Sequence, residues 1–283
     1  MTGTHGEQAV RRAAAAGLFY PADPEQLRIG IGYLLANSKV APKAGRVRAI
    51  IAPHAGYLYS GPVAAEAFAA LRAQEQRFRR VVVIGPAHRM RVRGIAVPSV
   101  GAFATPLGDV PLDIAAIQEI AVLPSVIARD EPHADEHALE VMLPFLQAVL
   151  GPVPIVPLLV GSATPQEVAE VLRRLWDDDT LIVVSSDLSH YLRYPEARRR
   201  DLATAEAIER LDETAIGFDD ACGALPVRGL LVEAKRRGLV IERLDLRNSG
   251  DTAGDRSQVV GYGAWVIRDG ESPTGAASVR NAS

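Results

Sequence analysis

The chain has 283 residues, of which 48% are hydrophobic and 23% charged, and its formal net charge at pH 7 is -3. This composition is typical of an ordinary globular protein. The slight negative charge disfavours nucleic acid as a partner, because nucleic-acid binding usually needs a basic face. No apolar run approaches the roughly 18 residues that would cross a bilayer, so we expect no membrane partner. The single cysteine, Cys222, excludes an intrachain disulfide.

The start of the chain resembles a signal peptide only loosely. Arg11 and Arg12 precede a short apolar run over 13–18, which leads at once into a proline-containing turn. We therefore expect a cytoplasmic protein. Residues 1–12 and 270–283 are small and polar, and we expect them to be flexible ends around a single domain over 13–269.

Helix and strand patterns alternate along the chain. A helix is predicted over 24–38, with Asp23 as N-cap and Pro24 in its first turn. Continuous apolar strands separated by helices predict an α/β fold, with a central mostly parallel or mixed sheet and helices on both faces. The predicted strands cover about 46–52, 80–85, 92–97, 155–160, 181–185, 240–246 and 259–266. The further predicted helices cover about 61–72, 111–122, 133–150, 165–176, 196–211 and 224–237.

Two histidines each follow a predicted strand directly. His54 comes after the apolar run 47–51, and His88 after the run 81–84. A third strand, ending near 185, leads into Asp187 and His190. Ligands usually bind at the carboxyl ends of strands in such sheets, where neighbouring strand ends lie side by side. The three strand ends therefore indicate a metal site or an acid–base site.

Several of these side chains allow more than one interpretation. If a helical turn begins at Ser186, Asp187 and His190 point to one side. Asp187 could then ligate a metal or orient a histidine, and His190 could act as acid or base. Helix capping is the simpler role for Asp187. Cys222 precedes a predicted helix and could have a lowered pKa, but a small buried hydrophobic role is favoured.

The segment from His133 to His137 reads H-x-x-E-H, a pattern found in zinc peptidases. Placed on one helix, it would bring two imidazoles to one face. An alternative interpretation uses only His137, which Glu136 or Glu140 would orient towards the cleft. The loop 248–255 is predicted to be a turn, although Ser249 could offer a polar group to a ligand.

These pieces together resemble a known family, the Memo family, whose prokaryotic members are often labelled AmmeMemoRadiSam system protein B. The matching stretches run in order over residues 16–268, nearly the whole chain. They are AGLFYPAD at 16–23, PHAGYLYSG at 53–61, GPAH at 85–88, EHALE at 136–140, LP at 143–144, SSDLSH at 185–190, CG at 222–223 and VGY at 260–262.

The resemblance implies a fold similar to that of class III extradiol dioxygenases, which are non-haem iron enzymes. It implies that His54 and His88 are metal ligands, and that Asp187, His190 and His137 line the pocket. Animal members carry a further cysteine ligand, which we place in the loop before the last strand. That loop reads Ser-Gly-Asp at 249–251 here, so a copper-type site is disfavoured. Two histidines with Asp187 would form a set suited to Fe(II), with copper or zinc as alternatives.

Three functions are compatible with these residues. The first is a metal-dependent redox or dioxygenase-type enzyme of unknown substrate, with His190 and His137 as catalytic residues. In that case Tyr57, Glu140 and Ser249 are expected to contact the substrate. The second is a non-catalytic binding or adaptor protein that holds a peptide or small molecule, with a companion radical-SAM protein implied by the family label. The third is a zinc peptidase, which would require His133.

Overall fold

The computed structural model describes residues 9–41, 43, 45–72 and 77–270. Its main sheet is mixed and has nine strands, in the order β10-β12-β2-β9-β3-β8-β4-β7, with β11 paired to β12. A small second sheet has the order β1-β5-β6. The strands are β1 Val10–Arg11, β2 Val47–Ala52, β3 Arg80–Pro86, β4 Ile95–Val97, β5 Ala102–Phe103, β6 Val110–Pro111, β7 Val126–Ala128, β8 Ile155–Val160, β9 Thr180–Ser185, β10 His190–Leu192, β11 Val240–Asn248 and β12 Val259–Arg268.

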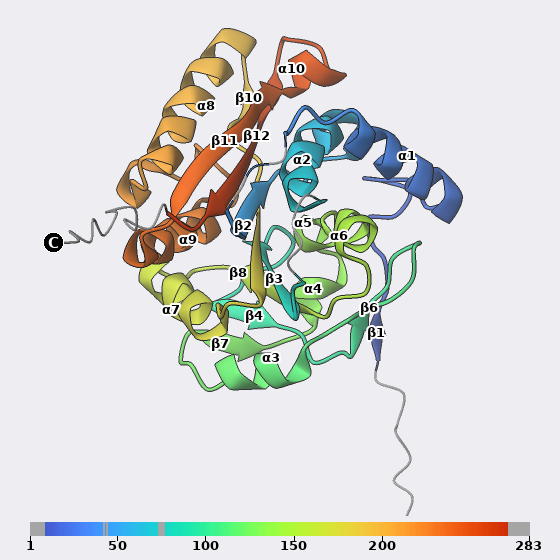
Figure 1. Cartoon of the computed structure of the whole chain (residues 1–283), viewed down its shortest axis with the longest axis vertical. Helices are drawn as coiled ribbons and strands as arrows, with labels where there is room; N and C mark the ends of the chain where they lie inside the picture. The colour runs from blue at the N-terminus through green and yellow to red at the C-terminus, as the bar shows by residue number, and fades with distance from the viewer. Residues whose placement is uncertain (1–8, 42, 44, 73–76, 271–283) are drawn as a thin grey trace, which may run out of the picture.

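Helices cover both faces of the main sheet, as expected. Figure 1 shows α7, α8 and α9 along one side and α1, α2 and α6 along the other. The helices are α1 Pro24–Ala36, α2 Tyr57–Arg72, α3 Ile114–Ile120, α4 Glu131–Ala134, α5 His137–Glu140, α6 Leu143–Leu150, α7 Pro165–Leu175, α8 Tyr194–Glu209, α9 Ala224–Arg237 and α10 Ser249–Thr252. Among the described residues, no helix is both long enough and apolar enough to cross a bilayer.

The centre of the sheet is the parallel set β2, β9, β3 and β8. Every residue of these four strands is buried, because helices cover both faces, which explains their continuous valine- and isoleucine-rich runs. Ala52 pairs with Ser185, and Ile84 pairs with Val184. The carboxyl ends of β2, β9 and β3 therefore lie next to one another, and the loops that follow them meet at one edge of the sheet.

The prediction of one continuous helix over 133–150 is wrong. The segment folds as three separate pieces, α4, α5 and α6. Glu136 lies between the first two with extended backbone angles, φ -82° and ψ 126°, and its side chain accepts a hydrogen bond from Ala138 N. The H-x-x-E-H pattern is thus not on one helix. The tertiary contacts of Glu136, described below, override the helical periodicity.

Two other boundaries differ from expectation. α2 begins at Tyr57 rather than near Gly61, and includes Pro62 in its second turn. No helical turn follows Ser186, since 186–189 is irregular and His190 opens β10. At the N-terminus, Val10 and Arg11 form β1. The expected flexible ends otherwise fall mainly on 1–8 and 271–283, which lie outside the described residues.

Candidate metal centre

His54 follows β2 and is 2% exposed. The Ser185 hydroxyl donates its proton to Ala138 O at 2.6 Å. Its oxygen is therefore the acceptor in the 2.7 Å contact with His54 Nδ1, and the imidazole proton lies on Nδ1. His54 Nε2 keeps a free lone pair, which is the form a metal ligand needs.

His88 follows β3 and is oriented by Glu136 in the same way. Glu136 accepts hydrogen bonds from His88 N at 2.6 Å, Ala138 N at 3.0 Å and Arg89 N at 3.3 Å. Burial opposes its ionisation, but the hydrogen bonds from His88 and Ala138 outweigh burial and lower the pKa of Glu136 to about 2. A carboxylate can only accept, so His88 Nδ1 donates at 3.0 Å and His88 Nε2 is left free.

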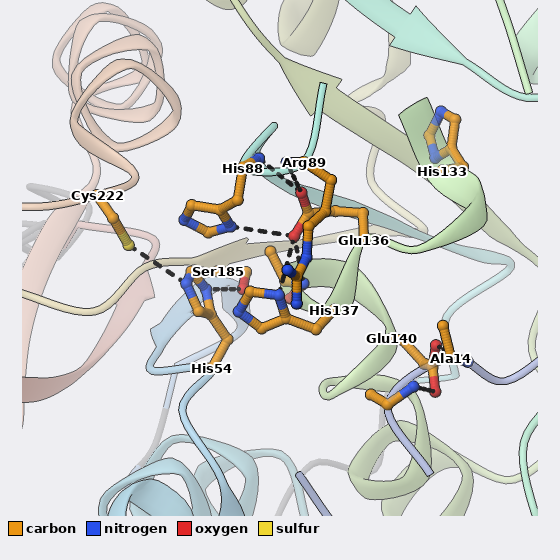
Figure 2. Close-up of polar contacts among 12 residues, drawn as sticks. Ala14, His54, His88, Arg89, His133, Glu136, His137, Glu140, Ser185 and Cys222 are labelled. Atoms are coloured by element: carbon orange, nitrogen blue, oxygen red, sulfur yellow. Dashed lines mark hydrogen bonds and ion pairs between the residues drawn. The ribbon is translucent and has the colours of Figure 1, made fainter. Parts of the chain in front are cut away.

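Cys222 completes a group of three ligand atoms with these histidines. Its Sγ lies 3.3 Å from His54 Nε2, and the ligand atoms of His54, His88 and Cys222 all lie within 4.8 Å of one another. Typical zinc–ligand distances place tetrahedral nitrogen and sulfur ligands about 3.5 Å apart. The donor set therefore fits a transition-metal ion, and Figure 2 shows Cys222 and His54 facing each other.

The sequence alone favours a packing role for Cys222, and the family resemblance directs the search for a cysteine ligand to the loop at 249–251. The structure instead places the thiol against His54. It is partly buried, and burial together with the nearby charge of Asp187 raises its pKa to about 12. Gly223 holds the cysteine loop against the strand ends: its N–H donates to Ser186 Oγ at 3.0 Å, and a Cβ there would lie 2.6 Å from Ser186 Cβ. The Cys-Gly pair before α9 was the one sequence signal that could have placed Cys222 in the pocket.

His137 lies beside these three candidate ligands, at the start of α5. Its ring centroid is 5.0 Å from that of His88 and 5.4 Å from that of His54. Phe19 stacks on it at 4.3 Å. Its Nδ1 is 3.2 Å from Glu136 Oε1, but the angle between the two groups does not allow a hydrogen bond. His88, Glu136 and His137 form a second group of possible ligands.

Burial keeps the imidazoles of His54 and His137 neutral. Loss of hydration is the largest effect, and neighbouring histidines add to it. They lower the pKa of His54 to about 3 and that of His137 to about 4. Both rings are therefore neutral near pH 7, which is the state required for metal ligation or for accepting a proton.

Asp187 and His190 do not join either group of possible ligands among the described residues. Asp187 is buried, and its Oδ1 accepts hydrogen bonds from His54 N at 2.7 Å and Ala55 N at 3.3 Å. Burial raises its pKa. His190 is exposed, and its ring contacts that of Tyr191 at a centroid distance of 5.8 Å. One oxygen of the carboxylate expected to ligate a metal thus fixes the backbone that carries His54.

The three expected substrate contacts have internal partners. Tyr57 donates its hydroxyl proton to Val141 O at 2.8 Å. Ser249 Oγ accepts from Val260 N at 3.1 Å. Glu140 is fully buried, and its oxygens accept from the Arg11 guanidinium, the Tyr20 hydroxyl, Ala14 N and Ala15 N. Glu140 therefore ties the N-terminal segment to α5.

His133 lies apart from the cluster in Figure 2. It is 1% exposed, and its Nε2 contacts Ala96 O at 3.2 Å. It belongs to neither group of ligand atoms found among the described residues. The two histidines of the H-x-x-E-H pattern thus face different surroundings.

Comparison with known proteins finds relatives that match nearly the whole chain. The family model of Memo-like proteins matches residues 11–266. A MEMO1 family protein of Methanopyrus kandleri is 35% identical over 92% of this chain and 99% of its own length. One from Aquifex aeolicus is 37% identical over 89% and 97%. One from Ignicoccus hospitalis is 38% identical over 90% and 97%.

A solved structure shares the fold at low identity. The uncharacterized protein JW3007 of Escherichia coli K12 matches with a TM-score of 0.50 and 17% identity, over 77% of this chain and 99% of its own. The fold and the histidine cluster define an α/β protein with a metal-capable strand-end pocket. The near-full-length matches establish its family: the chain belongs to the Memo-like proteins.

Proposed function

We propose that this protein is a metal-dependent redox or oxygen-using enzyme in which His54, His88 and Cys222 hold the metal ion. The observation that carries the proposal is the approach of three ligand atoms to within 4.8 Å of one another at the strand ends. A bound redox-active ion would supply electron transfer to a substrate or to dioxygen.

The surrounding residues prepare these ligands. Ser185 and Glu136 each fix one imidazole in the tautomer that leaves Nε2 free. Such oriented ligands bind a metal more tightly, because less rotational freedom is lost on binding. Asp187 holds the backbone of His54 in place, because its carboxylate accepts a hydrogen bond from the His54 N–H.

His137 is the proposed acid–base residue. It is neutral near pH 7, it lies 5.0 Å from the His88 ring, and Glu136 carries negative charge beside it. It can accept a proton from a substrate bound at the ligands, and Glu136 would stabilise the resulting imidazolium. His190, on the exposed side, is a second candidate for proton transfer to solvent.

The sulfur ligand alters the expected choice of metal. Two imidazoles with a carboxylate favour Fe(II), whereas two imidazoles with a thiolate also suit copper and zinc. A redox function requires iron or copper. The thiol must lose its proton when it ligates, so metal binding should release a proton and weaken as the pH falls.

The test is metal content by mass spectrometry, on protein purified without added metal and kept from air. Near-stoichiometric iron or copper in the wild type, lost in the His54→Ala, His88→Ala double variant, supports the proposal. His133→Ala is the matched control and should retain the metal. Absence of metal in the wild type, even after reconstitution with Fe(II) or Cu(I), overturns the proposal and favours a binding protein.

A different pattern would favour the zinc peptidase. Stoichiometric zinc that survives the double substitution but is lost in His133→Ala would place the metal at the H-x-x-E-H segment. The internal contact of His133 with Ala96 O argues against that result.

A further inference from the structure

A groove of about 660 Å³ lies beside the metal centre and shares His88 and Cys222 with it. The loop after β3, the end of β8 and the start of α9 form its walls. Its volume is in the range of about 300–1,000 Å³ that is usual for small-molecule sites. Its lining residues are those at 86–93 and 160–162, together with Phe218, Cys222, Leu225 and Pro226.

The groove is basic although the chain as a whole is slightly acidic. Arg89, Arg91 and Arg93 line it, and all three are exposed. None of its lining residues is an aspartate or glutamate. Within the described part of the chain, none of the three guanidinium groups is found in an ion pair. Unpaired guanidinium groups in one groove attract carboxylates and phosphates, which they bind bidentately.

The loop that carries the arginines is held in place. Val92 is 4% exposed, and Ser162 N donates to Val92 O at 2.9 Å. Gly161 N donates to Gly94 O at 2.9 Å. A Cβ on Gly161 would lie 2.0 Å from Val92 O, so the loop packs directly on the end of β8. Binding groups on a fixed backbone lose less freedom when a ligand binds.

Apolar side chains supply the other part of the lining. Met90 and Leu225 line the groove, as does Phe218, whose side chain is 72% exposed. The combination suits a molecule with an apolar or aromatic body and an anionic group.

We propose that this groove binds the carboxylate or phosphate of a small-molecule substrate whose other end faces His88 and Cys222. This inference rests on the proposed function, because it places the reacting end of the substrate at the metal ligands. It adds the class of substrate, a small organic anion, and assigns its recognition to Arg89, Arg91 and Arg93.

The test is calorimetric titration of the full chain with three probes of similar size: 3-phenylpropionate, phenyl phosphate and the neutral 3-phenylpropanamide. We expect at least one anion to bind more tightly than the amide, with an affinity that falls as salt is added. The triple variant Arg89→Gln, Arg91→Gln, Arg93→Gln should weaken that binding by about tenfold or more. The tighter of the two anions identifies the group that the groove recognises.

A control with the same change in net charge is Arg72→Gln, Arg77→Gln, Arg199→Gln, since these exposed arginines lie outside the groove. It should bind the anions like the wild type. Single substitutions at Arg91 and Arg93 serve if the triple variant unfolds at a lower temperature. Equal affinity for the amide, no binding of either anion, or unchanged affinity in the groove variants would overturn the inference.

Metal content measured on the same samples separates this inference from the proposed function. If metal is bound but the arginines do not affect anion affinity, the substrate class is wrong and the enzyme proposal stands. If no metal binds but the arginines govern anion affinity, the anion site stands and the enzyme proposal fails.

Discussion

Cys222 Sγ lies 3.3 Å from Nε2 of His54, although 168 residues separate them in the chain. Their contact brings the loop before α9 onto the end of β2 and places a thiol in the strand-end pocket. The two histidines are oriented by other residues, Ser185 and Glu136, so their free nitrogens face the thiol's side of the pocket. The pocket thus joins two pre-oriented imidazoles to a thiol from a distant loop.

Replacing the thiol should weaken metal binding without unfolding the protein. Cys222→Ser keeps the size of the side chain but removes the soft ligand, and we expect metal affinity to fall by about 100-fold or more. The measurement is competition with a chelator of known affinity, followed by mass spectrometry. Ser257→Ala is the control, because Ser257 is exposed and belongs to neither group of possible ligands among the described residues. Unchanged affinity in Cys222→Ser would remove the cysteine from the ligand set.

The Glu136 carboxylate, which orients His88, should contribute to metal affinity although it need not contact the metal. Glu136→Gln keeps the shape but replaces an acceptor oxygen with an amide, which cannot accept from both His88 N–H groups equally well. Loss of such an orienting carboxylate typically costs about 10–100-fold in metal affinity. The same chelator competition measures it, with the exposed Glu131→Gln as control. An effect as large as that of removing His88 itself would instead make Glu136 a direct ligand.

The metal-free protein should lose stability as the pH falls below about 6.5. The pKa of His54 is lowered to about 3, and the pKa values of His133 and His137 to about 4, from a usual 6.5. Between these values the unfolded chain binds protons that the folded chain does not, so acid favours unfolding. Glu136 acts in the same direction between about pH 4.5 and 2, because its pKa is also lowered.

Urea midpoints measured at pH 7, 5.5 and 4.5 would check this pH dependence. His133→Gln should reduce the decline without touching the metal centre, since His133 lies outside it. A midpoint that stays constant, or rises, as the pH falls to 4.5 would contradict the neutral, buried state of these imidazoles.

The buried pair of Arg11 and Glu140 should be important for folding. Both side chains are almost fully buried, and Glu140 also accepts from Ala14 N and Ala15 N. Glu140→Gln leaves Arg11 without a counter-charge, and we expect the free energy of unfolding to fall by about 3–5 kcal/mol. The exposed pair of Lys43 and Glu242 is the control, and Glu242→Gln should cost less than about 1 kcal/mol.

Denaturant unfolding followed by circular dichroism gives both values. A double substitution, Arg11→Met with Glu140→Gln, should cost less than the sum of the two single changes because no unpaired charge remains. Additive costs would show that the two side chains do not depend on each other.

A substitution of Tyr57 tests whether its hydroxyl stabilises the core or contacts the substrate. Its hydroxyl donates to Val141 O and its ring packs on Phe145 at 4.9 Å. Tyr57→Phe should lower the free energy of unfolding by about 1 kcal/mol and leave metal content unchanged. It should also leave anion affinity unchanged. A weaker affinity for the anionic probes, with unchanged stability, would instead support substrate contact by this hydroxyl.

Much of the fold could be predicted from local sequence. The strands that end before His54 and His88 are predicted within about a residue, because buried parallel strands are unbroken apolar runs. α9 is predicted at its observed bounds, 224–237, with a basic last turn and Gly238 as its C-cap. In contrast, the short strands β1, β5, β6, β7 and β10 carry too few residues to show a period, and their sequence patterns do not reveal them.

The predicted helix over 133–150 is broken twice. The break before α6 has a local signal, Pro144 in the first turn of that helix. The break at Glu136 had no local cause that could be recognised, because the apolar spacing there is compatible with a helix. The break exists because Glu136 bonds to His88 N, Arg89 N and Ala138 N at once, which an uninterrupted helix would not permit. Two of these partners are nearly fifty residues away.

The sequence by itself determined that two imidazoles emerge from neighbouring strand ends, since strand and loop patterns are local and parallel strands align their carboxyl ends. Only the tertiary structure decided what joins them. Cys222 reaches His54 because Gly223 allows its loop to pack on Ser186. Asp187 accepts a hydrogen bond from the backbone N–H of His54, and His133 contacts Ala96 O. Each of these side-chain positions depends on contacts between residues far apart in the chain, which no local sequence pattern encodes.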